Sequence, residues 1–125
     1  MSQNPKEFSA PLTVTKTEKG TWLVANGFRY YPLHSDPIDV PAGFETDFAS
    51  VPRGLWNIFP PDGPWTQAAV LHDLLYNTRG FHLRTRKECD KIFLEAMAAL
   101  GVPFWKRQVM YRAVRCFGWA YWDKK

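Results

Sequence analysis

Three polar side chains recur at helical spacing in a stretch that is otherwise apolar. His72, Asp73 and Tyr76 follow Ala69 by three, four and seven residues, a spacing that places all four on one face of an α-helix. A histidine can act as a general base near neutral pH, and a carboxylate can hold a hard cation. We therefore predict that this face carries the functional site. The structural alternative is a satisfied core histidine beside a solvated aspartate.

A further carboxylate, Asp90, lies on the next predicted helix, at the edge of its apolar stripe. The connection between the two helices is short, about Thr78 to Arg84, which favours antiparallel packing. Asp90 could then accept a hydrogen bond from His72 or Tyr76. A carboxylate in that position fixes the tautomer of an imidazole and stabilises its charged form. A salt bridge between Asp90 and a nearby arginine is the structural alternative.

Two reaction designs fit these residues. In the first, His72 is a general base that deprotonates water, Asp90 orients the imidazole, and Asp73 holds a hard divalent cation, calcium rather than zinc, with loop oxygens completing the cation's shell. In the second, His72, Asp73 and Asp47 bind a transition metal directly. The second design is weaker because adjacent residues on a helix point about 100° apart and rarely chelate one ion.

A long segment with prolines and no clear period, residues 41–53, precedes this helix. A loop of this length in a small domain is usually functional. Its Asp47 is expected to lie opposite His72 as a cation ligand or charge partner, and Arg53 could bind an anion or pair with Asp47. Ser50 is a weaker candidate nucleophile because no Gly-x-Ser-x-Gly turn surrounds it. Asp47 and Ser50 could instead be local caps and turn-formers.

The elements that position these residues follow from local patterns. Alternating, β-branched stretches predict strands over 12–17, 21–25, 28–31 and 38–40, with a short one at 44–46. Asn26-Gly27 predicts a tight hairpin, since both positions tolerate positive φ. Helices are predicted over 65–77, 86–100 and 104–121, the second opened by a Thr85/Glu88 capping box.

The predicted fold class is therefore α+β: a small N-terminal antiparallel β-sheet, a long ordered loop and three C-terminal helices. We expect a single domain over residues 1–125. It comprises a flexible leader at 1–10, a β-rich part with the loop at 11–53, and a helical part at 64–122.

The third predicted helix carries basic and aromatic residues along one face: Gln108, Arg112, Arg115, Trp119 and Trp122. Its expected core face consists of Val109, Ala113, Phe117 and Ala120. A basic stripe that ends in two tryptophans suits a membrane interface, a nucleic acid or another protein subunit. The structural alternative is a solvated basic face with the tryptophans folded back on the sheet.

Composition and charge limit these alternatives. The chain has 125 residues, 46% of them hydrophobic, and no apolar run approaches the roughly 20 residues of a membrane span. Residues 1–63 hold five Lys/Arg and seven Asp/Glu, and residues 64–125 hold eleven and five, for a net charge of +4. This modest charge makes nucleic acid the weakest partner. Cys89 and Cys116 are expected to be buried free thiols.

Much of the chain resembles a family of small bacteriophage and prophage proteins of uncharacterised function. The resemblance rests on three stretches, Val40–Arg53 with its Thr-Asp-x-Ala-Ser-Val-Pro-Arg run, Ala68–Tyr76 with His-Asp-x-Leu-Tyr, and Asp90–Met97. It implies a phage origin and supplies no function. We therefore expect association with the virion. We also expect synthesis in the host cytoplasm, because the polar N-terminus shows no secretion signal.

The helix pair also resembles the catalytic helices of secreted phospholipases A2, through His72-Asp73-x-x-Tyr76 and then Cys89-Asp90. That resemblance implies that the histidine activates water, the adjacent Asp73 binds calcium, and Tyr76 and Asp90 support the histidine. The chain departs from the family after Asp90, where bulky apolar residues follow. The supporting cysteines and the glycine-rich calcium loop are absent.

Two main hypotheses follow. The first is a phage-encoded hydrolase with a His72/Asp90 dyad and a bound cation, similar to phospholipase A2. The alternative is a non-enzymatic virion or tail protein whose polar cluster is a buried network, with other virion subunits or a membrane surface as partners. An enzyme needs His72 in an open cleft, whereas a structural network needs it packed dry and hydrogen-bonded.

Overall fold

The computed structural model describes residues 7–46 and 65–123. The chain divides into two compact units, Met1–Asp47 and Phe48–Lys125. Among the described residues, the first unit contains strands and no helix, and the second unit, which follows it in the chain, contains helices and no strand. The predicted α+β class is therefore confirmed.

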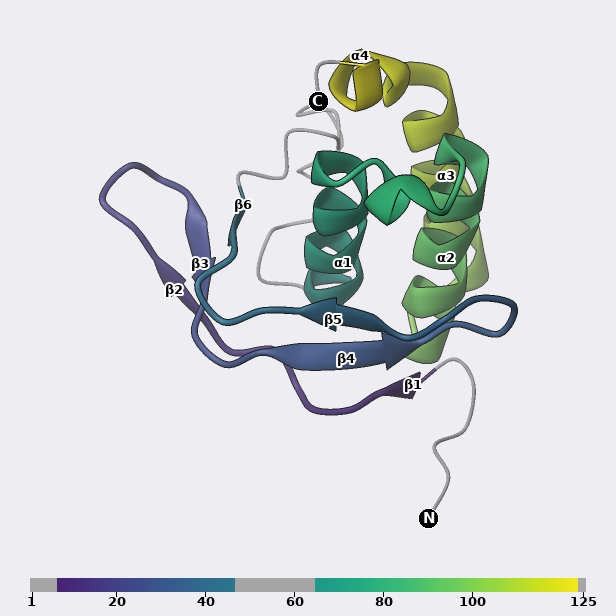
Figure 1. Ribbon diagram of the computed structural model, residues 1–125. Coiled ribbons are helices and arrows are strands. Elements are labelled where there is room, and N and C mark those ends of the chain that lie inside the picture. The colour runs from purple at the N-terminus through teal and green to yellow at the C-terminus, as the bar shows by residue number, and fades with distance from the viewer. Residues whose placement is uncertain (1–6, 47–64, 124–125) are drawn as a thin grey trace. The chain divides into compact units, whose positions relative to one another are not determined.

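Within residues 7–46, six short strands form two antiparallel sheets (Figure 1). One sheet has the order β1-β4-β5, from Glu7–Phe8, Phe28–Tyr31 and Ile38–Val40. The other has the order β2-β3-β6, from Val14–Lys16, Trp22–Val24 and Glu45–Thr46.

Strict alternation fixes the first of these sheets. Phe28 and Tyr30 are buried on β4 while Arg29 between them is exposed, and β5 repeats the pattern around its exposed Asp39. Arg29 and Asp39 are cross-strand partners and form an ion pair at 2.6 Å on the outer face. The ends of β4 and β5 therefore fall where the alternation in the sequence predicts.

The predicted hairpin at Asn26-Gly27 is wrong, because β3 and β4 belong to different sheets. Beyond β3, the amide of Ala25 donates to Thr13, and Val24 exchanges hydrogen bonds with Gly43 and Phe44. Both edges of this strand end are thereby occupied, so β4 cannot pair with it. Gly27 instead passes close to residues 40–42.

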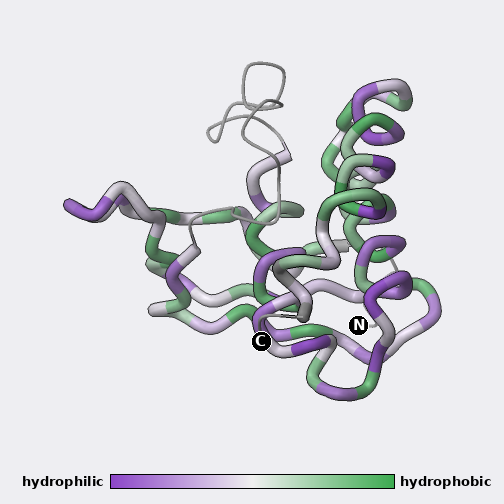
Figure 2. Tube along the Cα trace, turned by 90° about the horizontal axis from the view of Figure 1, so that it is seen from above, coloured by the Kyte–Doolittle hydropathy of each residue, from purple (hydrophilic) through white to green (hydrophobic). Residues whose placement is uncertain are grey.

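In its described residues, 65–123, the second unit contains α1 (Thr66–Asn77), the short 3₁₀ turn η2 (Gly80–His82), α2 (Arg86–Ala99), α3 (Phe104–Phe117) and α4 (Trp119–Asp123). Helix α2 packs against both α1 and α3. The helices carry both hydrophilic and hydrophobic residues along their length (Figure 2). Among residues 65–123, no helix has the length and apolar content to cross a membrane.

Helix α1 is buried along almost its whole length, from Thr66 to Tyr76. It has more buried residues than α2 or α3. The Thr78 hydroxyl closes its C-terminus by donating to the Leu74 carbonyl at 2.9 Å. Arg79, Phe81 and His82 then adopt left-handed backbone conformations, which turn the chain sharply toward α2.

Helix α2 begins as predicted. The Thr85 hydroxyl accepts from the Glu88 amide at 3.1 Å, and the Glu88 carboxylate accepts from the Thr85 amide at 2.8 Å. This reciprocal capping box is a strictly local interaction, which explains why the sequence locates it correctly.

The expected core face of the third helix is wrong by about one residue. Met110 and Val114 are buried there, whereas Val109 is 38% and Phe117 is 61% exposed. Apolar residues occur all around this helix, so spacing alone does not define the buried side. The helix also ends at Phe117, and α4 is a separate element after Gly118.

Both cysteines are free thiols, as expected. Cys89 is buried on α2, and burial raises the pKa of its thiol to about 12. Cys116 is exposed, which corrects the expectation that it is buried. It lies on the side of α3 opposite the buried pair Met110 and Val114.

Candidate functional site

A buried carboxylate lies at the centre of the helical unit. Asp90 is 0% exposed, and four side chains donate to its two oxygens. His72 Nε2 at 2.7 Å and the Tyr76 hydroxyl at 2.6 Å contact Oδ1. Arg115 Nη1 at 2.8 Å and Arg86 Nη1 at 3.5 Å contact Oδ2. We call these five residues the Asp90 cluster.

The helices bring the cluster together by antiparallel packing. Tyr76 contacts Arg86, while His72, one turn earlier on α1, contacts Asp90, one turn later on α2. Arg115 reaches the same carboxylate from α3. The four-residue steps on both helices therefore match, as the sequence predicts for neighbours joined by a short connection.

Asp90 is held ionised by its donors. Burial alone would raise its pKa, but the hydrogen bonds from His72, Tyr76 and Arg115 outweigh burial and lower it. An ionised carboxylate only accepts hydrogen bonds. The proton between Asp90 and the imidazole must therefore reside on His72 Nε2.

The His72 ring is fixed from two further sides. It stacks on Phe93 with the ring centroids 4.5 Å apart, and it lies 4.2 Å from the Tyr76 ring. Its side chain is 0% exposed. The two ring contacts and the bond through Nε2 hold the imidazole in one orientation, with Nδ1 as the basic nitrogen of its neutral form.

Tyr76 is held as a donor. Burial, followed by the charge of Asp90, raises the pKa of its hydroxyl, which therefore stays protonated. The same oxygen accepts from Arg86 at 3.4 Å. The Tyr76 ring meets Trp122 of α4 edge to face at 5.3 Å.

Gly118 provides the space for Tyr76. A Cβ built on this glycine would lie 2.6 Å from the Tyr76 hydroxyl oxygen and 2.5 Å from the Val114 carbonyl oxygen. Any larger residue would collide with both. The break between α3 and α4 thus falls where the tyrosine approaches the backbone.

Arg86 ties the cluster to the end of α3. Its Nη1 donates to the Val114 carbonyl at 3.0 Å and its Nη2 donates to the Arg115 carbonyl at 3.2 Å. Both carbonyls belong to the last turn of α3, where the helix dipole attracts cations, and the Val114 carbonyl also accepts from the Gly118 amide at 2.8 Å. The guanidinium therefore stabilises the C-terminus of α3 and the Asp90 carboxylate together.

The structure brings together three of the predicted site residues, His72, Tyr76 and Asp90, and the predicted hydrogen bonds to Asp90 are present. The arginine pairing that was the alternative for Asp90 is present as well. Arg115 was predicted for an outer binding face, yet it turns inward to Asp90.

The other predicted residues lie elsewhere. Asp73 is buried on α1, while Arg112 and Trp119 are exposed. Asp47, Ser50 and Arg53 fall outside the described residues. Within residues 7–46 and 65–123, no group of three side chains of the metal-binding types could hold an ion. Calcium binding by Asp73 and Asp47 stays a prediction.

Sequence reasoning missed Arg86, Phe93 and Gly118. A signal existed for Arg86, which precedes Asp90 by four residues and so lies on the same helix face. Gly118 and Phe93 gave no such signal, because their roles depend on contacts with a different helix.

The arrangement matches the support of a general base. A carboxylate behind an imidazole fixes its tautomer and stabilises the cation formed when the ring takes a proton. Here the carboxylate is itself fixed by two arginines and a tyrosine. Because the His72 side chain is 0% exposed, proton abstraction through Nδ1 would require a substrate to reach the buried ring.

Comparisons with known proteins place the chain in a family. The model of the family described as protein of unknown function (DUF1353) matches residues 12–114. The chain is 38% identical over 81 residues to the uncharacterized protein y4jT of Sinorhizobium fredii (strain NBRC 101917 / NGR234), which covers 63% of this chain and 23% of that protein. It is 33% identical over 103 residues to the uncharacterized protein y4iH of the same organism, covering 79% of this chain and 42% of that protein.

The chain thus spans less than half the length of either of these curated relatives. No solved structure matches it. The matched residues 12–114 include α1, α2 and the strands from β2 to β6. The chain belongs to the DUF1353 family.

Proposed function

We propose that this protein is a hydrolase in which His72 acts as the general base. The observation that carries the proposal is the 2.7 Å hydrogen bond between His72 Nε2 and the buried Asp90 carboxylate. It holds the imidazole in the tautomer whose Nδ1 can accept a proton.

In the proposed step, Nδ1 takes a proton from water while the water oxygen forms a bond to the carbonyl carbon of an ester. The resulting imidazolium is stabilised by Asp90. It then returns the proton to the leaving alcohol oxygen as the carbon–oxygen bond breaks. Because the His72 side chain is 0% exposed, this step requires movement of the groups that cover it.

The resemblance to phospholipase A2 supports a lipid ester as the substrate class. It assigns Asp73, next to His72 on α1, to calcium, and assigns Tyr76 and Asp90 to support of the histidine. The bonds from His72 and Tyr76 to one Asp90 oxygen agree with that assignment. A bound calcium ion would supply positive charge for the developing oxyanion.

The test is ester hydrolysis by the wild-type protein and His72→Gln, using p-nitrophenyl butyrate and dihexanoyl phosphatidylglycerol, each with and without calcium. General-base catalysis contributes about 10²–10⁴-fold, so the variant should lose at least about a hundredfold in kcat/KM. His34→Gln, an exposed histidine of the first unit, is the matched control and should keep full activity. Equal rates for wild type and His72→Gln would refute the proposal.

A second candidate is a non-enzymatic role, in which the Asp90 cluster only holds the helices together in a phage virion or tail protein. The complete burial of His72 and Asp90 favours it. Under this alternative His72→Gln lowers thermal stability, and neither substrate is hydrolysed by any form of the protein. Hydrolysis that depends on His72 would exclude it.

A further inference from the structure

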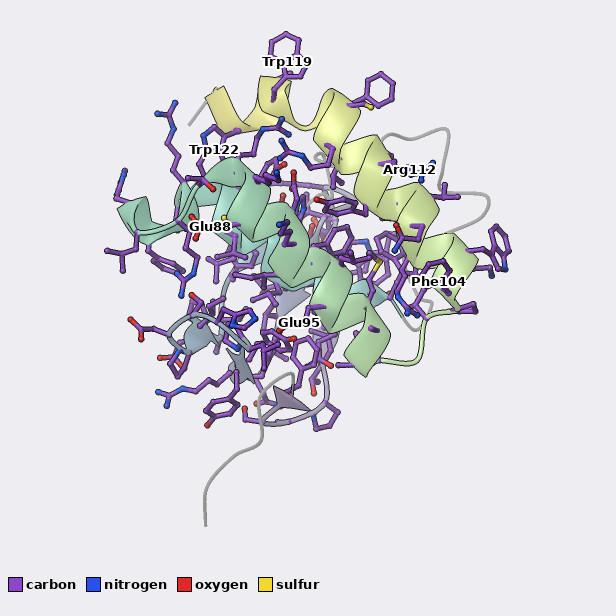
Figure 3. The ribbon with its side chains drawn as sticks, turned by 90° about the vertical axis from the view of Figure 1, so that its right-hand side faces the viewer. Glu88, Glu95, Phe104, Arg112, Trp119 and Trp122 are labelled. Carbon is purple, nitrogen blue, oxygen red and sulfur yellow. The ribbon has the colours of Figure 1, made fainter. Side chains whose placement is uncertain are left out.

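Helix α3 and the start of α4 expose several large apolar side chains. Exposed fractions there are 65% for Phe104, 57% for Trp105, 61% for Phe117 and 58% for Trp119. Figure 3 shows Phe104 at one end of this stretch, Trp119 at the other and Arg112 between them. The α3 surface is our name for the following residues, of which Val109 is 38% exposed: Phe104, Trp105, Val109, Arg112, Phe117 and Trp119.

Charge on this stretch has one sign. Residues 96–122 contain four Lys/Arg and no Asp or Glu. Two of the cations lie over exposed rings, Lys106 Nζ at 5.6 Å from the Trp105 centroid and the Arg107 guanidinium carbon at 5.1 Å from that of Phe104. The aromatic rings and the positive charges are therefore presented together.

Only part of that charge is directed outward. Arg115 is bound to Asp90, and Arg107 also donates to the Val102 carbonyl at 2.9 Å. Lys106 and Arg112 are the two cations of this stretch that form no hydrogen bond or ion pair with another of the described residues. Nucleic-acid binding depends on many phosphate contacts, so two cations beside four exposed aromatic rings fit it poorly.

We propose that the α3 surface binds the headgroup region of an anionic phospholipid bilayer. Indole and phenyl rings enter the boundary between headgroups and acyl chains, while lysine and arginine contact lipid phosphates. The absence of carboxylates over residues 96–122 makes the surface complementary to negative charge. The proposal does not depend on the chemistry of His72.

The test is cosedimentation with large vesicles of phosphatidylglycerol and phosphatidylcholine at a ratio of about 1:1, which gives them an anionic surface. Vesicles of phosphatidylcholine alone are the comparison. The full chain should bind the mixed vesicles more tightly, and the binding should weaken as salt rises. The double variant Trp105→Ala/Trp119→Ala should lower partitioning into the vesicles at least about tenfold, because it removes two rings that the bilayer would bury. Arg112→Gln should weaken binding to the mixed vesicles only.

Matched controls separate the surface from general effects. Leu83→Ala removes a 75% exposed apolar side chain outside the surface, and Lys91→Gln removes an exposed cation of α2. Both should bind like the wild type, and circular dichroism should show that all variants are folded. The proposal is overturned by no binding to mixed vesicles, or by unchanged binding of the double variant.

Two other outcomes would also overturn it. One is that the same variants abolish a concentration-dependent dimer while vesicles are not bound, which would assign the surface to a second copy of the chain. The other is that the wild-type chain binds a single-stranded oligonucleotide and no vesicles, and that the same variants lose this binding.

Discussion

At the scale of single residues, Asp90 determines the state of its neighbours. It is fully buried, yet it stays ionised because hydrogen bonds from His72, Tyr76 and Arg115 outweigh the cost of burial. An ionised Asp90 requires a proton on each of its donors. The protonation state of the whole cluster therefore follows from one carboxylate.

Replacing that carboxylate should be costly. Asp90→Asn leaves Arg86 and Arg115, which are 19% and 29% exposed, without their counter-charge. Breaking a buried ion pair costs about 3 kcal/mol or more of unfolding free energy, measurable by urea denaturation. The matched control is Asp39→Asn, which breaks the exposed pair with Arg29 and should change little. Equal losses in the two variants would contradict the role given to Asp90.

Acid should weaken the protein through the same group. The pKa of Asp90 is lowered in the folded state, so below its ordinary value of about 4 the unfolded chain binds a proton that the folded chain does not. Stability from Asp90 is thus present above about pH 4 and is lost as the pH falls through the lower, folded pKa. Asp90→Asn should show a shallower loss of unfolding free energy below pH 4; an unchanged slope would argue against a lowered pKa.

At the scale of elements, the end of α3 is where the cluster is attached to the rest of the unit. Arg86 binds the last carbonyls of α3, and Tyr76 contacts Gly118 and Trp122 beyond that end. A change at this corner should therefore be felt at Tyr76. The residue that follows α3 is a glycine, Gly118, where a Cβ would lie 2.6 Å from the Tyr76 hydroxyl oxygen.

Gly118→Ala tests this corner. The added methyl group would lie within 2.6 Å of the Tyr76 hydroxyl oxygen, and overpacking of this kind costs about 1–3 kcal/mol. Tyr76→Phe removes that oxygen, so the cost of Gly118→Ala should be smaller in the Tyr76→Phe background. Unfolding free energies of the four proteins form a double-mutant cycle. Additive effects would show that the two residues do not meet.

At the scale of the whole molecule, local signals predicted more than long-range ones. The capping box of α2, the bounds of β4 and β5, and the contact of His72 and Tyr76 with Asp90 follow from spacing over a few residues or across a short connection. These features needed no knowledge of distant segments.

The failures share one physical cause. The hairpin at Asn26-Gly27 does not form because segments distant in sequence occupy the edges of β3. The buried side of α3 was misplaced because residues such as Trp105 and Phe117 are apolar yet exposed. Exposed apolar residues interrupt the helical spacing by which a buried face is recognised in a sequence. The same residues form the surface that we propose to bind lipid.

The most direct test of the central claim is the tautomer of His72, measured by long-range ¹H–¹⁵N correlation NMR on labelled protein at a pH where the ring is neutral. The account predicts a proton on Nε2, donated to Asp90, and a basic Nδ1, with the signal pattern altered in Asp90→Asn. A proton on Nδ1 in the neutral ring would contradict it, because the imidazole could not then act as the base that the Asp90 cluster is proposed to support.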